Sequence, residues 1–336
     1  LNGLRVERRD DSLVLDAATR RNLELEHATS GQAAHTLAGV LDHTATAMGG
    51  RLLRRWIHRP LRDHEVLRQR HRCIASLQEA QLYASLHDQL ASINDIERIL
   101  TRIALKSARP RDLTGLRDSL AVLPGLQQML GACGDPLLQA LSERIGQHPG
   151  VHTLLVRAIK DEPPLLIRDG GVLADGYDAS LDELRNLSEN GDQLLVDMEQ
   201  QERERSGIST LKISYNRVHG YYIEVSRLHA EKVPDDYQRR QTLKAVERYI
   251  TPELKSHEDK VLSARERALS LEKALYNTLL ETLGEHLDSL RGCAEALAEL
   301  DVLANFSERS DTLGLTCPTL SDQRGIDIRQ GRHLVV

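Results

Sequence analysis

The chain has 336 residues and a net charge of −6, with 28% charged and 40% hydrophobic residues. Its length allows two or three domains with cores of their own, and its composition is ordinary for a globular protein. The net charge excludes a protein that is basic as a whole. No run approaches 18 uncharged apolar residues, so we expect no membrane span.

Cysteine spacing and short motifs exclude several kinds of site. The four cysteines are far apart and form no CxxC pair, which argues against zinc and thioredoxin-type sites and favours reduced thiols. A phosphate loop, a GxGxxG after a strand, HExxH and GxSxG are all missing from the sequence. We therefore predict no catalytic residues, no bound metal and no cofactor in this chain.

Apolar residues at helical spacing predict short helices from residue 16 to about 157. One begins near Thr36, and Pro124 is expected to separate two others. The segment RLLRRWIHRPL (51–61) predicts a helix with Trp56 in a core. Its arginines could contact phosphate, but a solvated helix face is the favoured interpretation. They are Arg51, Arg54, Arg55 and Arg59.

A glycine pair marks the end of this helical region. Gly170 and Gly171 follow Arg168-Asp169 between two short apolar runs, which predicts a hairpin or a sharp turn. Backbone N–H groups in such a turn can hold a phosphate. A turn with a purely structural role is far more common and is the favoured interpretation.

Two long helices are predicted on either side of a segment of different character. The first begins at Asp178 and ends before Gly207. The second begins at Pro252, since proline is tolerated in a first helical turn. Apolar side chains recur every seven residues in the second helix, which predicts packing of the two as an antiparallel arm. Gly284 and Gly292 are expected to mark a bend or break.

The segment between these helices has the period of a β-sheet. Apolar residues alternate with polar ones in 211–215 and again in 221–225, which predicts two half-buried strands joined by a turn at Gly220. A third strand is predicted from Arg239 to Lys244. The expected fold is therefore mainly α, with two long antiparallel helices that carry a small antiparallel sheet.

Charge is concentrated in this predicted sheet. Residues 209–251 contain eight basic and five acidic side chains, a local charge of +3 in a chain of net charge −6. Such a segment can bind a polyanion, and a solvated charged sheet explains the composition equally well. An arm of about 25 helical residues would reach about 37 Å, more than the roughly 20 Å width of a DNA duplex.

Eight stretches spread over nearly the whole chain carry a family resemblance. They are DAATRRNLEL (16–25), MGGRLLRRWIHRPLRD (48–63), DIERILTRIAL (95–105), RPRDL (109–113), RDGGVLADGYDASLDELR (168–185), VHGYYIEVSR (218–227), RRQTLKAVERYITPELKSHEDKVLSARERALSLEK (239–273) and GRHLVV (331–336). Together they resemble the middle of the bacterial MutS family of DNA mismatch-recognition proteins.

The resemblance implies a domain layout. Residues 1–14 would end a connector domain, and 15–191 with 252–315 would form a discontinuous core or lever domain. Residues 192–251 would form a clamp domain, and 316–336 would begin a truncated ATPase domain. The mismatch-reading domain and the Walker A loop would lie outside this fragment. The fragment is therefore expected to be no enzyme, whereas the full-length protein would be a DNA-dependent ATPase that binds ATP and magnesium.

The resemblance also implies partners and a role in DNA mismatch repair. The clamp would contact the backbone of double-stranded DNA without reading sequence, and the lever would relay between the DNA and the ATPase domain. The full-length protein would pair with a second MutS subunit as a homodimer and bind a MutL-type repair protein. Its expected location is the cytoplasm, at the nucleoid. The alternative is a helical scaffold whose arm tip docks on a protein partner.

Basic and polar residues of the predicted sheet are the candidate DNA-backbone ligands, because such groups bind phosphate. They are Lys212, Asn216, Arg217, Arg239, Arg240, Thr242, Lys244 and Arg248. Lys244 is the strongest candidate, since it lies in RRQTLK beside the third strand. Relatives often carry Asn-Ala after this lysine, where this chain has Ala245-Val246, and Leu334 stands where a proline is usual.

Overall fold

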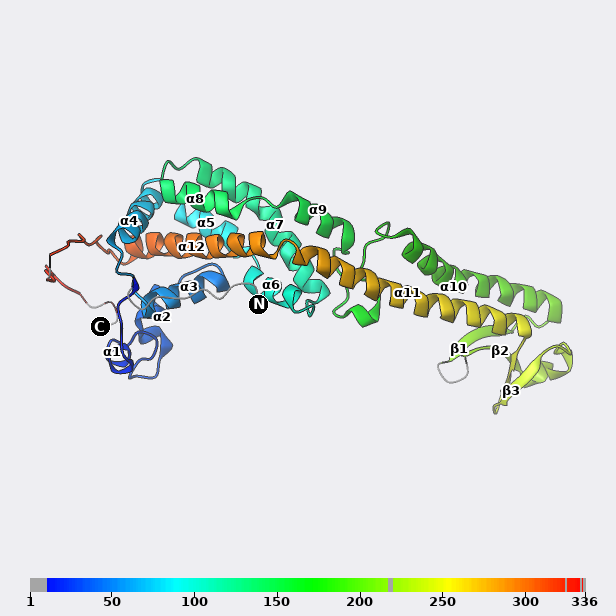
Figure 1. Cartoon of the computed structure of the whole chain (residues 1–336). Helices are drawn as coiled ribbons and strands as arrows, with labels where there is room; N and C mark the ends of the chain where they lie inside the picture. Colours follow the sequence, from blue (N-terminus) through cyan, green and yellow to red (C-terminus); the bar gives the residue numbers. More distant parts are fainter. Residues whose placement is uncertain (1–10, 217–219, 324, 333, 335–336) are drawn as a thin grey trace. The chain divides into compact units, whose positions relative to one another are not determined.

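Helices form most of the chain, as the apolar spacing predicts. The computed structural model describes residues 11–216, 220–323, 325–332 and 334, apart from the side chains of residues 189–194. Within these residues the prediction of a mainly α fold with a small antiparallel sheet is confirmed (Figure 1). The chain divides into two compact units, one comprising residues 1–156 and 280–336, the other 157–279.

The first unit is built around a central helix, α12 (Leu287–Thr312). Helices α3 to α6 and α8 all contact α12, and Leu297, Leu300 and Leu303 of this helix are fully buried. The other helices of the unit are α1 (Ala17–Asn22), η2 (Ala33–His35), α2 (Leu37–Leu41), α3 (Ala47–His58), α4 (His64–Glu79), α5 (Tyr83–Ala91), α6 (Ile96–Ala104), α7 (Pro110–Gly131) and α8 (Pro136–Ile145). Helix α9 (Pro149–Ala158) follows α8 in the chain.

A buried carboxylate joins α12 to the start of α3. Asp301 accepts hydrogen bonds from the Ala45 N–H at 2.9 Å and from the Thr46 hydroxyl at 2.6 Å, and burial raises the pKa of Asp301. Gly49 passes so close that an added Cβ would lie 2.1 Å from Asp301 Oδ2. The contact requires glycine there because any side chain would displace the carboxylate.

Two predicted helix breaks are wrong, and tertiary packing explains both. Pro124 lies inside α7, where Leu123 and Leu126 are fully buried. Gly292 lies inside α12, next to the buried Cys293. Burial of the apolar stripe of each helix outweighs the loss of helix propensity, which is about 1 kcal/mol for glycine and about 3 kcal/mol for proline. Gly284 does end a helix, α11, as predicted.

The second unit contains the two predicted long helices. Its elements are η3 (Ile167–Asp169), α10 (Ala179–Ser206), β1 (Lys212–Asn216), β2 (Gly220–Ser226), η4 (Arg227–Lys232), β3 (Gln238–Thr242), β4 (Val246–Ile250) and α11 (Pro252–Gly284). Asp178 caps α10 by accepting the Leu181 N–H at 2.9 Å, and Gly207, at φ +65°, ends it. Both predicted boundaries of this helix are confirmed.

Helices α10 and α11 run side by side in opposite directions (Figure 1). Near the start of α10, Arg185 pairs with Glu272 of α11 at 2.8 Å. Near its end, Met198 packs into the cluster that contains Leu254, from the start of α11. The predicted antiparallel pairing of the two helices is therefore confirmed.

The sheet has four antiparallel strands in the order β1-β2-β4-β3. The two alternating runs form β1 and β2 as predicted, and β2 begins at Gly220, although the turn before it (217–219) lies outside the described residues. The third strand ends at Thr242, so Lys244 lies in the turn that follows. Strand β4 was not predicted. Its apolar alternation is interrupted by Glu247, an acidic residue that is nevertheless buried.

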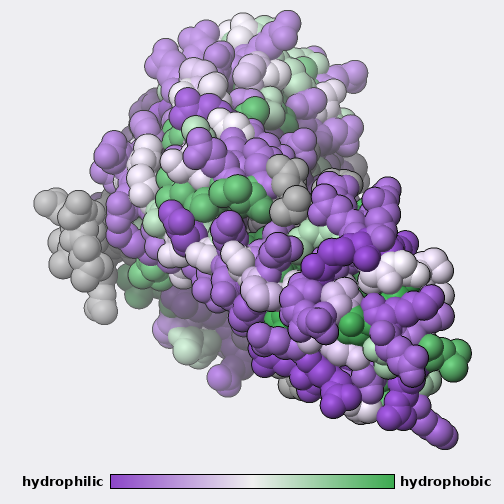
Figure 2. All heavy atoms as spheres, turned by 90° about the vertical axis from the view of Figure 1, so that its right-hand side faces the viewer, coloured by the Kyte–Doolittle hydropathy of each residue, from purple (hydrophilic) through white to green (hydrophobic). Residues whose placement is uncertain are grey.

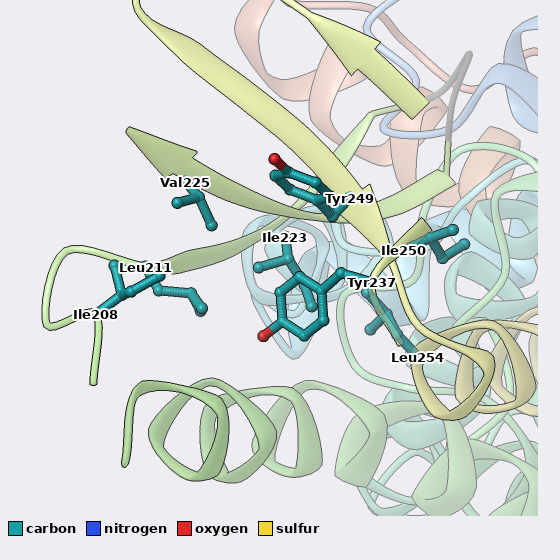
Figure 3. Packing of buried hydrophobic residues seen from close by; sticks show 8 residues of the cluster. All are labelled: Ile208, Leu211, Ile223, Val225, Tyr237, Tyr249, Ile250 and Leu254. Carbon is teal, nitrogen blue, oxygen red and sulfur yellow. The ribbon is translucent and has the colours of Figure 1, made fainter. Parts of the chain in front are cut away.

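One face of the sheet packs over the ends of the two long helices (Figure 3). The cluster is formed by Ile208, Leu211, Ile223, Val225, Tyr237, Tyr249, Ile250 and Leu254. Ile223 pairs directly with Tyr249 across the strands, and directly paired residues share a face. This small core holds the sheet against its supporting helices.

Candidate nucleic-acid interface

Polar contacts from the last turns of α10 fix the position of the sheet. The Ile213 N–H of β1 donates to Glu199 at 2.7 Å, and Arg203 Nε donates to the Leu211 carbonyl at 2.7 Å. The Tyr237 hydroxyl donates to Glu202 at 2.5 Å. These side chains join β1 and the segment before β3 to the last turns of α10.

The two ends of the sheet differ in their surroundings. At one end, Gly220 lies against α11, where an added Cβ would be 1.9 Å from Glu258 Oε1. At the other end is the turn between β3 and β4, which contacts the end of β2 through the Arg227 N–H and the Ala245 carbonyl at 3.1 Å. Strand β4 separates Lys244 from the start of α11 by roughly 15 Å at about 3.3 Å per residue.

We call this second end the basic end. It gathers exposed side chains that can donate hydrogen bonds and, in four of five cases, carry a positive charge. They are Arg227, Arg239, Arg240, Thr242 and Lys244. Four of the eight predicted DNA ligands are in this group: Arg239 lies near the start of β3, and its guanidinium reaches Glu247 beside the basic end at 3.6 Å. Figure 2 looks onto the sheet-bearing end of the second unit, where hydrophilic residues dominate and hydrophobic ones form small separate patches.

Arg227 belongs to this group but was not among the predicted ligands. It is 12 residues before Arg239 in sequence and is brought close by the pairing of β2 with β4. Its position directly after an alternating run was the available signal, since the ends of neighbouring strands meet at one edge of a sheet.

A β-bulge sets the direction of Arg240. The register of β3 against β4 shifts between Arg239 and Gln241, so Arg240 is an extra residue without a directly paired partner. A bulge bends its strand and re-aims the side chain. Arg240 is exposed and makes no ion pair within the described residues.

The remaining predicted ligands lie elsewhere. Lys212 is exposed on the edge strand β1, and Asn216 is at the end opposite to the basic end. Arg217 lies outside the described residues. Arg248 is half-buried on the outer face, where its guanidinium lies 4.2 Å from the Tyr222 ring centroid.

Arg248 also has polar partners within the sheet. It pairs with Glu224 at 3.3 Å and donates to Gln241 at 3.1 Å. These contacts engage its guanidinium in cross-strand interactions and leave it less available to a phosphate than the exposed arginines.

Glu247 is an acidic residue beneath the basic end. Its Oε1 lies 3.6 Å from Arg239 Nη1 and 3.8 Å from Arg227 Nε. Its Oε2 accepts the Tyr249 hydroxyl at 2.5 Å. Burial, together with this carboxylate, raises the pKa of Tyr249 to about 12.

The glycine turn at 170–171 holds an anion, but the anion is part of the protein. The N–H groups of Gly171, Val172 and Leu173 donate to the Glu272 carboxylate at 2.9, 2.7 and 2.9 Å. Arg185 adds a bond of 2.8 Å to the same carboxylate. The structural interpretation of this turn is confirmed, whereas the hairpin is wrong: Leu173 forms a bridge with Ile159 instead.

The arginines of α3 are a weaker candidate for phosphate contacts. Arg51 donates to Asp95 at 2.7 Å and to Glu97 at 2.6 Å, which raises the pKa of Arg51. Arg54 pairs with Asp42 at 2.9 Å. Among the described residues, no cluster of His, Cys, Asp and Glu is arranged to bind a metal, and no helix could cross a membrane.

The fold and this surface define a class of protein: a helical body with two long antiparallel helices that present a small, basic antiparallel sheet. The family model for MutS domain III matches residues 18–307, which include both long helices and the whole sheet. The chain belongs to the MutS family of DNA mismatch repair proteins, so the resemblance read from the sequence is confirmed. Members of this family bind DNA and form dimers.

Proposed function

We propose that the chain binds the backbone of double-stranded DNA through the basic end and acts as the clamp of a mismatch repair protein. The observation that carries this proposal is the set of exposed cationic side chains along β3, in the turn between β3 and β4, and at the end of β2. Lysine and arginine on such a surface neutralise phosphates without reading bases. Residues 192–251 would be the clamp domain in this proposal.

The same proposal gives the long helices a mechanical role. The sheet is tied to α10 by Glu199 and Arg203, and the base of α10 is tied to α11 by the pairing of Arg185 with Glu272. A load on the sheet would therefore pass to both helices rather than bend a loop. This supports a lever that relays between DNA and an ATPase domain, where the full-length protein would bind ATP and magnesium.

Partners of the full-length protein are part of the proposal. A second MutS subunit would complete the enclosure of the DNA, and a MutL-type repair protein would bind the assembled complex. The lever would comprise residues 15–191 and 252–315, and the fragment itself would have no enzymatic activity.

The test is fluorescence anisotropy of a labelled duplex of 30 base pairs, titrated with the chain at several salt concentrations. A version in which a short Gly-Ser turn replaces residues 209–251 serves as the comparison. We expect the intact chain to bind with a log K that falls as log salt rises, and the shortened version not to bind. Equal binding by both versions would reject the proposal.

One observation favours the alternative of a protein-docking tip. Leu228 follows Arg227 in η4 and is 91% exposed, so almost none of this apolar side chain is covered by the rest of the chain. If a protein partner docked here, Leu228→Ser would abolish its binding and leave DNA binding unchanged. Loss of DNA binding in this variant would instead place Leu228 at the DNA interface.

A further inference from the structure

A buried carboxylate lies under the basic end, where a DNA-binding surface would be expected to avoid negative charge. Glu247 is 6% exposed. It occupies an inward position of β4, on the same face as the core residue Val225, its direct partner on β2. Its hydrogen bond with the Tyr249 hydroxyl, at 2.5 Å, fixes one carboxylate oxygen.

Two arginines flank this carboxylate from opposite sides. Strand β4 lies between β2 and β3 in the sheet. Arg227 follows β2 and Arg239 lies on β3, so each arginine approaches Glu247 from a neighbouring strand. The distances to Glu247 Oε1 are 3.8 and 3.6 Å.

Both guanidinium groups remain able to donate hydrogen bonds outward. The Arg227 and Arg239 side chains are 54% and 63% exposed. Their distances to Glu247 exceed those of normal hydrogen bonds, and within the described residues neither guanidinium donates a hydrogen bond to the protein. Two arginines that share one carboxylate keep a net charge of +1, which matches the charge of a single phosphodiester.

We propose that Arg227 and Arg239 form a phosphate subsite for the DNA backbone and that Glu247 restrains the affinity of this subsite. The inference rests on the proposed function and adds a ligand, Arg227, and an internal limit on binding strength. Guanidinium donors suit phosphate oxygens. The carboxylate holds the two arginines in place when no DNA is bound. When DNA is bound, its negative charge repels the phosphate and weakens binding.

The test compares binding of the labelled 30-base-pair duplex by the whole chain and its variants at several salt concentrations. Glu247→Gln keeps the shape of the side chain and removes its charge, so we expect binding about threefold to tenfold tighter at low salt. The double variant Arg227→Gln/Arg239→Gln should bind more weakly, with a salt slope shallower by about 0.9 for the lost phosphate. Adding Glu247→Gln to that double variant should change nothing further.

Glu231→Gln is the matched control, because Glu231 is an exposed acid of η4 in the same unit. It should tighten binding by less than about twofold, because its charge is exposed and screened by solvent. An equal gain from Glu231→Gln and Glu247→Gln would overturn the proposal, since net charge alone would then explain both. A gain that persists without the two arginines would also overturn it.

Two variants separate the subsite from the proposed function. If replacing residues 209–251 leaves DNA binding unchanged, the proposed function is wrong. If that replacement abolishes binding but the arginine double variant binds like the original chain, only the subsite is wrong. The double variant changes exposed side chains alone, so it tests the subsite even if Glu247→Gln fails to fold.

Discussion

In the second unit, individual buried carboxylates accept hydrogen bonds from several groups at once. Glu272 is 2% exposed and is one of the acidic side chains most completely removed from water in this unit. Three backbone N–H groups and Arg185 satisfy it. A buried charge is tolerated only when its hydrogen bonds are complete, so Glu272 fixes the turn at 171–173 against α11.

Glu272→Gln should therefore destabilise the chain by about 2–4 kcal/mol, because the amide cannot accept all four hydrogen bonds and leaves donors unpaired. Urea unfolding followed by circular dichroism measures the effect. Glu266→Gln, at an exposed position of the same helix, should change stability by less than about 0.5 kcal/mol. Similar stabilities for the two variants would show that the turn does not depend on the carboxylate.

Tyr249 reports the charge on Glu247. Its pKa is raised to about 12 by burial and by the hydrogen bond to the carboxylate. A phenol with a raised folded-state pKa stabilises the fold below about pH 10, and this contribution is lost as the pH rises towards 12. In Glu247→Gln the pKa of Tyr249 should fall, which NMR of ring-labelled tyrosine can follow. An unchanged pKa would mean that the carboxylate has no electrostatic effect at this position.

Elements of the sheet differ in how far the sequence predicts them. Strands β1 and β2 follow from alternation because their inward positions are apolar. Strand β4 does not, because an inward position holds Glu247, whose hydrogen bond to Tyr249 is not visible in the sequence. The basic end was predicted only where its members are close in sequence. Arg227 joins them through strand pairing, which depends on the fold.

Two glycines of the sheet region provide a matched pair for a prediction. Gly207 and Gly220 have φ values of +65° and +71°, so alanine strains the backbone at either position. At Gly207 nothing lies within 4 Å of an added Cβ, whereas at Gly220 the buried Glu258 lies 1.9 Å away. Gly207→Ala should cost about 1 kcal/mol.

Gly220→Ala should cost about 1–2 kcal/mol more than Gly207→Ala, because Glu258 must also leave its place. Thermal unfolding of the two variants beside the original chain gives the difference. Equal losses would indicate that Glu258 moves aside freely and does not anchor this end of the sheet.

At the scale of the whole molecule, positive charge is concentrated in the sheet although the chain as a whole is acidic. The chain as a whole carries −6, yet four exposed cationic side chains gather at one end of a four-stranded sheet. Such a separation concentrates the attraction for a polyanion at the sheet. The central claim is that this end, and no other basic surface of the chain, holds the DNA backbone.

The most direct measurement of that claim is the salt dependence of duplex binding for two triple variants. One replaces Arg239, Arg240 and Lys244 with glutamine, and the other replaces three exposed arginines of the first unit. The second set is Arg20, Arg21 and Arg111. Both variants change the net charge by the same amount, so the comparison isolates position from charge.

The first variant should lose at least about tenfold in affinity at low salt, and its log–log salt slope should become shallower by about 2–3 units, at about 0.9 per phosphate. The second should keep the original slope. Equal slopes for the two variants, or a larger change in the second, would contradict the account and place the DNA on another surface.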